Sequence, residues 1–165
     1  MKIDHIDFLL AIVIVLIAAS FSAGVYMHWI RMSVIMGQFR FSHWLTIIGT
    51  TYIAVATPVF VVLKRFYPQR ISGLFRFHIF GNLLFFALIS IHFANQMGRP
   101  AANFPELGTG LALYIALTLQ VASGFTQRFI SENRYLMTNK FIHASLIIVF
   151  YLVILFHVLH GLGIT

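Results

Sequence analysis

The segment from residue 76 to residue 94 reads RFHIFGNLLFFALISIHFA, an apolar run of helical length with a histidine near each end. These two histidines, His78 and His92, are fourteen residues apart. Fourteen residues turn an α-helix by about 1,400°, so the imidazoles would lie about 40° apart around the axis and about 21 Å apart along it. The segment therefore predicts a helix that presents two imidazoles on one face at two depths.

A second segment repeats this arrangement later in the chain. Residues 141–162 read FIHASLIIVFYLVILFHVLHGL, and His143 and His157 are again fourteen residues apart. Two such helices side by side would form two stacked sites with two histidines each. A low-spin haem iron takes two axial imidazoles from opposite sides, which suits ligands at matched height on two helices. The pattern predicts two b-type haems with bis-histidine ligation.

The composition predicts an integral membrane protein. The chain has 165 residues, of which 60% are hydrophobic and only 9% charged, and its mean hydropathy is +0.92. Soluble domains carry about 25% charged residues, so we expect a lipid bilayer around this chain. We interpret the net charge of +7 as a topology signal and expect no nucleic-acid partner. The chain has no cysteine, which excludes disulfides, iron–sulfur ligation and covalent c-type haem attachment.

Five apolar segments predict an all-α integral membrane helical bundle, a single domain over residues 1–165 with the haems between the third and fifth helices. A cleaved signal peptide is the alternative reading of the first segment, but two preceding aspartates and its length argue against it. Pro58 is a candidate kink in the second segment. The predicted spans are approximately residues 8–27, 44–63, 77–94, 109–130 and 141–162.

Lysine and arginine are unevenly distributed between the two sides that five spans define. The side of the N-terminus holds eight of them: Lys2, Lys64, Arg65, Arg70, Arg76, Arg128, Arg134 and Lys140. The other side holds Arg31, Arg40 and Arg99. Because positive residues favour the cytoplasm, we expect a multi-pass protein of the cell membrane with its N-terminus cytoplasmic and its C-terminus outside.

This topology predicts which histidines share an iron. The third and fifth spans run in the same direction, because one span lies between them. His78 and His143 would then meet at the cytoplasmic depth, and His92 and His157 at the outer depth. The alternative reading of any single histidine in a span is a hydrogen-bonded interior residue.

Other histidines leave alternatives open. His160 lies three residues beyond His157 and about 100° off the predicted ligand face, so it is the alternative ligand to His157. His28, His43 and His160 all fall near the predicted outer surface. They could contact a quinone, a metal substrate or a haem propionate, or be interface histidines with no special role.

Basic residues close to the predicted ligands are candidate partners of haem propionates. Arg76 and Lys140 lie two or three residues before the inner ligands, and Arg99 lies seven after His92. Their alternative role is to anchor helix ends. With Arg70 and Arg134, the first two would form a cytoplasmic basic surface for an acidic partner or for anionic lipid headgroups.

The histidine pattern resembles the transmembrane domain of the ferric reductase/NADPH oxidase family. In that family the third and fifth spans each carry two haem-ligating histidines, and the N-terminus is cytoplasmic. The matching residues are His78 and His92 in the third span, and His143 and His157 in the fifth. The resemblance covers about residues 40–162. The cytochrome b of quinol-oxidising complexes has a similar two-pair arrangement and remains an alternative.

The chain differs from that family in two respects, and these differences change the expected function. Family members usually have a sixth span, often followed by a flavin- and NADPH-binding module. Here no sixth span and no glycine-rich dinucleotide fingerprint is present. The resemblance then implies a subunit of a membrane redox complex that carries electrons across the membrane between a separate donor, such as a quinol, and an acceptor. The alternatives are a stand-alone ferric or quinone reductase and a non-redox structural or assembly subunit, so whether the chain is itself an enzyme stays open.

Overall fold

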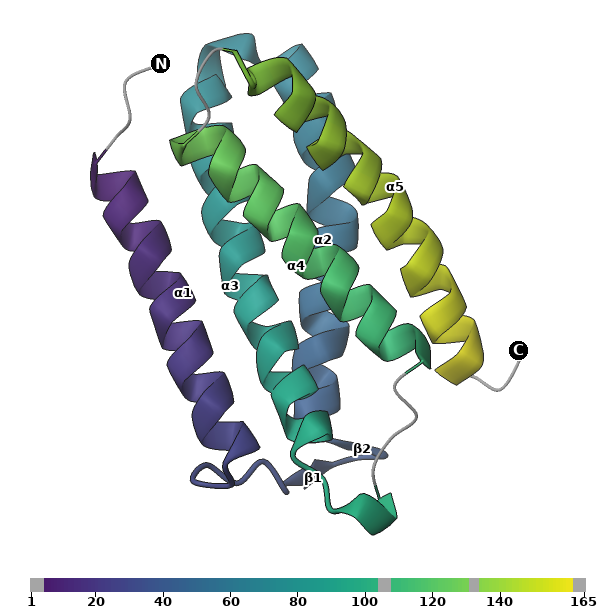
Figure 1. Ribbon diagram of the computed structural model, residues 1–165. Coiled ribbons are helices and arrows are strands. Elements are labelled where there is room, and N and C mark those ends of the chain that lie inside the picture. Colours follow the sequence, from purple (N-terminus) through teal and green to yellow (C-terminus); the bar gives the residue numbers. More distant parts are fainter. Residues whose placement is uncertain (1–4, 104–107, 131–133, 162–165) are drawn as a thin grey trace. The chain divides into compact units, whose positions relative to one another are not determined.

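The computed structural model describes residues 5–103, 108–130 and 134–161. Within these residues there are five α-helices that are long and apolar enough to cross a membrane (Figure 1). They are α1 (His5–Tyr26), α2 (Phe41–Phe66), α3 (Ile71–Met97), α4 (Gly108–Phe129) and α5 (Leu136–Gly161). The predicted all-α class with five membrane-spanning helices is confirmed, and the chain is a multi-pass membrane protein. Lys2 and the last residue of the predicted fifth span, Leu162, lie outside the described residues.

Four helices begin three or more residues before the spans that hydropathy predicts, and two of them also end three residues later. Helix α1 begins at His5, α2 runs from Phe41 to Phe66, α3 runs from Ile71 to Met97, and α5 begins at Leu136. Polar residues end a hydropathic segment, but they do not end a helix as long as backbone hydrogen bonding continues. His43 and Lys140, which were expected in connectors, therefore lie on helices. The connector between α2 and α3 is reduced to Tyr67 and the short 3₁₀ helix η1 (Pro68–Arg70).

The connector between α1 and α2 contains a small hairpin. Strands β1 (Ile35–Met36) and β2 (Phe39–Arg40) pair antiparallel, with Ile35 opposite Arg40. Gly37 in the turn has a φ of +65°, a left-handed conformation that glycine adopts without a steric penalty. The Trp44 indole N–H donates to the carbonyl of Met36 at 2.9 Å and ties the hairpin to α2.

The described helices fall into two compact units. The N-terminal unit lies within Asp4–Pro105 and the C-terminal unit within Glu106–Thr165. In the N-terminal unit α3 packs against both α1 and α2. In the C-terminal unit α4 packs against α5.

Helices α1 and α3 run parallel, because contacts join their matching ends. Near their starts, the Arg76 Nε lies 3.1 Å from Oδ2 of Asp7, a carboxylate that is buried. Near their ends, a Cβ added to Gly98 would lie 3.0 Å from the carbonyl oxygen of Tyr26. The missing side chain at Gly98 thus lets the chain after α1 approach the end of α3.

Helices α2 and α3 run antiparallel and approach closely at glycines. The hydroxyl of Tyr52 on α2 occupies the space that a Cβ at Gly81 would need. A Cβ at Gly49 would lie 3.0 Å from the carbonyl oxygen of Phe85. These contacts give Gly81 and Gly49 a role in close helix packing.

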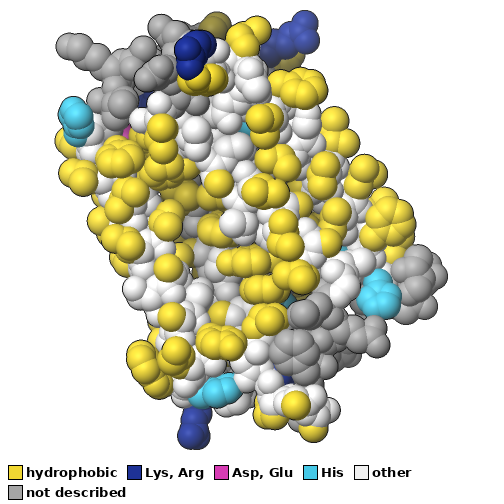
Figure 2. All heavy atoms as spheres, in the orientation of Figure 1, with side chains coloured by type: hydrophobic (Ala, Val, Ile, Leu, Met, Phe, Trp, Pro, Cys, Tyr) yellow, Lys and Arg dark blue, Asp and Glu magenta, His cyan; other side chains and the backbone are white. Residues whose placement is uncertain are grey.

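The helices expose much of their apolar surface. Hydrophobic side chains cover most of the face shown in Figure 2. Many large apolar residues are more than half exposed, among them Leu16, Ile17, Ile148 and Leu155. An apolar surface of this extent is expected of helices that face lipid.

Candidate functional site

The two histidines of α5 are bonded to two hydroxyl groups of α4. His143 Nδ1 lies 2.9 Å from Oγ of Ser123, and His157 Nδ1 lies 3.1 Å from Oγ1 of Thr109. The two hydroxyl residues are fourteen apart on α4, as the two histidines are on α5. Because the helices are antiparallel, the same hydroxyl–imidazole contact occurs twice at two depths.

Each of these hydroxyl residues is followed by a glycine. A Cβ at Gly124 would lie 3.1 Å from Cε1 of His143, and a Cβ at Gly110 would lie 3.4 Å from Cε1 of His157. The edge of each imidazole therefore lies directly against the α4 backbone. At Gly124 the contact is tight enough that a methyl group would displace the ring or the helix. The sequence signal is the repeated pair Thr109-Gly110 and Ser123-Gly124, which the histidine spacing alone did not reveal.

The hydrogen bonds of Ser123 determine the tautomer of neutral His143. The Ser123 hydroxyl donates to the carbonyl oxygen of Gln120 at 2.9 Å, which uses its single proton. The contact with His143 is then satisfied only if Nδ1–H donates to the Ser123 oxygen. The proton of the neutral ring lies on Nδ1, and Nε2 carries the lone pair. A histidine that binds iron through Nε2 needs this tautomer.

His92 on α3 has the same tautomer, but a different hydrogen bond determines it. Its Nδ1 lies 3.0 Å from the backbone carbonyl oxygen of Ser42, in the first turn of α2. A carbonyl oxygen only accepts, so Nδ1–H is the donor and Nε2 of the neutral ring carries the lone pair. Asn95, three residues later, donates to the hydroxyl of the same serine at 3.1 Å. The end of α3 is thus tied to the start of α2 by two side chains.

His78, the other histidine of α3, is held differently. Its ring stacks on Phe60 of α2, with centroids 4.4 Å apart and an interplanar angle of 20°. The amide nitrogen of Asn82, one turn later on α3, lies 3.2 Å from Nδ1 and 3.4 Å from Nε2. An amide N–H donates, so in this arrangement the ring nitrogen accepts. Iron ligation through Nε2 would require the Asn82 amide to turn over, so that its Oδ1 accepts from Nδ1–H. In the present arrangement Oδ1 is buried and has no hydrogen-bond partner among the described atoms.

His43 lies beside His92 in the N-terminal unit. Their ring centroids are 5.0 Å apart and the rings meet edge to face at 71°. Nδ1 of His43 is buried and has no hydrogen-bond partner among the described residues. A buried, unpaired ring nitrogen is costly, which makes His43 a candidate contact for a further group. His160 is exposed, whereas His157 is half-buried and bonded to Thr109; this supports the preference for His157 as the ligand.

The predicted propionate partners have different surroundings. Arg76 already pairs with Asp7, and its side chain is 53% exposed. Lys140 is exposed on α5, one turn before His143. Arg99 is half-buried just after α3 and lines a cavity of the N-terminal unit. Their role toward haem propionates stays a prediction.

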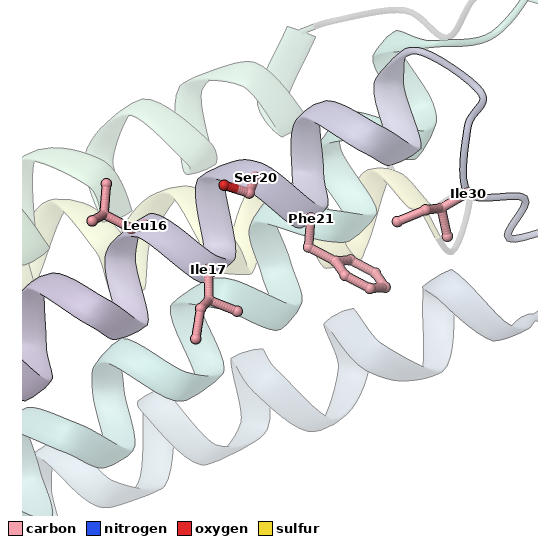
Figure 3. Close-up of a pocket in the computed structure, with 5 residues that line it drawn as sticks. All are labelled: Leu16, Ile17, Ser20, Phe21 and Ile30. Atoms are coloured by element: carbon pink, nitrogen blue, oxygen red, sulfur yellow. The ribbon is translucent and has the colours of Figure 1, made fainter.

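A shallow, largely apolar depression lies on the exposed surface of the N-terminal unit. It is lined by Leu16, Ile17, Ser20, Phe21 and Ile30, and the Ser20 hydroxyl is its one polar side-chain group (Figure 3). No titratable side chain lines it, so it suits a lipid acyl chain and supplies no ligand to a metal.

Across the described part of the chain, no three histidine or acidic side chains gather in a group that would hold a lone metal ion. A haem needs only two axial ligands from the protein, and imidazole is a suitable donor. The Nδ1–H donors of His92 and His143, which leave Nε2 of each ring with its lone pair, fit such a group. His78 and His92 lie in the N-terminal unit and His143 and His157 in the C-terminal unit, so their pairing stays a prediction. No family model, curated protein or solved structure matches the chain, and a functional interpretation therefore depends on these residues themselves.

Proposed function

We propose that the chain is a diheme b-type cytochrome subunit that carries electrons across the cell membrane between a separate donor and a separate acceptor. The observation that supports this best is the repeated contact on α4, where Ser123 and Thr109 bond to Nδ1 of the two α5 histidines. A hydrogen-bond partner at the nitrogen that does not bind the metal fixes the orientation and basicity of a ligating imidazole.

Four histidines would hold the two haems. His78 and His143 would bind the haem at the cytoplasmic depth, and His92 and His157 the haem at the outer depth, with the N-terminus in the cytoplasm. When bound, the two groups would supply one-electron transfer at two depths of the membrane. With both ligands supplied by histidines, each group would support electron transfer and not oxygen binding.

The basic residues would attract the electron donor and neutralise haem propionates. Arg70, Arg134 and Lys140 are exposed and would attract an acidic electron donor on the cytoplasmic side. Lys140 would neutralise a propionate, whereas Arg76 is already engaged by Asp7 and Arg99 lines a separate cavity of the N-terminal unit. A quinone remains a candidate donor or acceptor, and the buried Nδ1 of His43 beside His92 is the polar group best suited to contact it.

A non-redox structural or assembly subunit is the second candidate. It is favoured by the fact that His92, His143 and His157 each bond to a neighbouring helix, as a purely structural buried histidine would. In this case the histidines would hold helices together and no metal would be needed.

Transfer of electrons across a vesicle membrane separates the two candidates. The purified, haem-loaded protein would be reconstituted into vesicles that contain ferricyanide, and a membrane-impermeant reductant would be added outside. The proposal predicts reduction of the trapped acceptor by the wild type and its loss in His92→Ala and His157→Ala. Equal rates for wild type, both variants and protein-free vesicles would contradict it.

A further inference from the structure

A polar cavity of about 330 Å³ lies at one end of the N-terminal unit. The connector after α1 and the end of α3 form its walls, and its polar lining includes His28, Arg31, Ser33, Arg40, Asn95 and Arg99. The connector turns back at His28, whose φ of +61° is left-handed, and the backbone N–H of Ile30 then donates to the carbonyl of Gly24 at 3.1 Å. Residues that precede the hairpin, together with Arg40 of β2, thus line the cavity with residues at the end of α3.

Three guanidinium groups line this cavity, and no carboxylate of the described residues lines it with them. The chain has four acidic residues, and the one that the structure describes, Asp7, pairs with Arg76 near the start of α3. Arg31, Arg40 and Arg99 are therefore a concentration of like charge among the described residues. A bound anion would relieve their mutual repulsion.

Arg99 has the strongest need for such a partner. It is half-buried, and its Nε is buried with no hydrogen-bond partner among the described residues. Burial and the charge of Arg40 lower the pKa of the Arg99 guanidinium from its usual value. A buried donor left unpaired costs free energy that an oxyanion would recover. The planar guanidinium donates two parallel N–H groups, which suits phosphate oxygens.

The surroundings indicate the depth of the cavity in the membrane. The chain has two tryptophans, and both lie on the segments that flank the cavity: Trp29 is 80% exposed and Trp44 is 37% exposed. Exposed tryptophan is typical of the boundary between lipid tails and headgroups. Apolar side chains of the hairpin, such as Ile35 at 71%, are also exposed beside it. A cavity at this depth faces lipid headgroups.

We propose that this cavity binds the phosphate of an anionic phospholipid headgroup through Arg31, Arg40 and Arg99. The acyl chains lie along the exposed apolar surface of the adjoining helices. Basic pockets at the ends of membrane helices bind lipid headgroups in this way. The proposal does not depend on haem binding, because all three arginines and the tryptophans belong to the N-terminal unit.

Lipid retention measured by native mass spectrometry tests this site. The full-length protein, delipidated in a non-ionic detergent, would be titrated with phosphatidylglycerol and, separately, with phosphatidylcholine of the same acyl chains. The wild type should hold one phosphatidylglycerol more tightly than phosphatidylcholine. The variant R31Q/R40Q/R99Q should lose this preference and bind phosphatidylglycerol about ten- to a hundredfold more weakly, since it lacks charged hydrogen bonds to the phosphate.

A matched variant controls for net charge. K64Q/R65Q removes two positive charges from exposed positions of the same unit, near the end of α2, and should bind phosphatidylglycerol as the wild type does. Its matched partner is the cavity variant R40Q/R99Q, which removes the same charge and should weaken binding. If the cavity variants do not fold, Arg99→Gln alone should still weaken binding several-fold. Equal weakening in the two double variants would overturn the proposal. Saturation of the cavity by inorganic phosphate with no competition from the lipid would also overturn it, by identifying a free anion as the ligand.

Discussion

The two histidines of α5 are held in the same way, whereas the two histidines of α3 are held in different ways. On α5, both Nδ1 atoms contact a hydroxyl of α4 that is followed by a glycine. On α3, His92 donates to a backbone carbonyl of α2, and His78 is contacted by an amide of its own helix. The α5 contacts repeat because both helices carry the same fourteen-residue spacing. No such repeat exists on α2, so each α3 histidine depends on the particular residue that faces it.

The largest effect is expected from the histidines themselves. Replacing His78 or His143 by alanine should remove the same cytoplasmic haem and leave the outer one spectrally intact. Replacing His92 or His157 should do the converse, because the proposal assigns these two histidines to one iron. Haem content and low-temperature difference spectra of each variant are the measurements. If the unlike supports on α3 reflect unlike roles, His78→Ala and His143→Ala will instead give different spectra.

His160 provides the control for this series. His160→Ala should retain both haems, because His160 is exposed and lies off the predicted ligand face. Full haem content in His157→Ala with loss of the outer haem in His160→Ala would show that the spacing argument selects the wrong neighbour.

The next effect is expected from the hydroxyls of α4. Ser123→Ala removes the acceptor of the His143 Nδ1–H and should lower affinity for one haem by roughly 10- to 100-fold. Thr118→Ala is the matched control, because that hydroxyl is exposed on the same helix and donates to Tyr114 of its own backbone. Haem titration of the apo-protein measures both. Identical affinities for Ser123→Ala and Thr118→Ala would mean that the hydroxyl–imidazole contact serves packing alone.

A somewhat smaller effect is expected at Asn82, and it sharpens the contrast between the two helices. If the amide turns over to accept from Nδ1–H of His78, Asn82→Asp keeps the acceptor and Asn82→Leu removes it. We expect Asn82→Leu to lower the affinity for one haem about tenfold and Asn82→Asp to retain it, because a group that hydrogen-bonds to a ligating imidazole fixes its orientation. Comparable loss in both variants would show that the amide donates to the ring and opposes ligation.

The smallest effect is expected at Gly110 and Gly124, because the two glycines of α4 lie at different distances from the histidine rings. Alanine is favoured over glycine in a helix by up to about 1 kcal/mol. At Gly110 the new methyl would meet His157 at an ordinary distance of 3.4 Å, so Gly110→Ala should stabilise the protein. At Gly124 the distance is 3.1 Å, and the strain should cancel that gain. Thermal unfolding in detergent compares the two, and equal shifts would contradict the difference.

The sequence predicted the number and class of helices well, because a membrane span requires a long apolar segment. It predicted both ends of α4 to within one residue, but it missed the starts of α1 and α5 and both ends of α2 and α3 by three or more residues. The polar residues that close a hydropathic segment, such as Lys64 and Arg65, continue as the last turn of α2, where positive charge is favourable. His43 was consequently expected in a connector, although it lies on α2 beside His92.

The site was predictable only in part. The four histidines follow from their spacing, and the repeated hydroxyl–glycine pairs of α4 carry a matching signal in the sequence. The contact between the Ser42 carbonyl and His92 has no signal in the sequence, because every residue has a backbone carbonyl. The Asp7–Arg76 pair joins residues that are far apart in sequence, and it engages an arginine that spacing had suggested for a propionate. The arginine cavity depends on a left-handed turn at His28, which composition does not reveal.

The most direct test of the central proposal is a reduced-minus-oxidised spectrum of the purified wild-type chain, combined with haem quantification. Bis-imidazole ligation by His78 with His143 and by His92 with His157 predicts two b-type haems per chain. Both should be low-spin and six-coordinate in each oxidation state and should not bind carbon monoxide when reduced. A chain that purifies folded but takes up no haem, or whose spectrum is unchanged when all four histidines are replaced, would contradict the account.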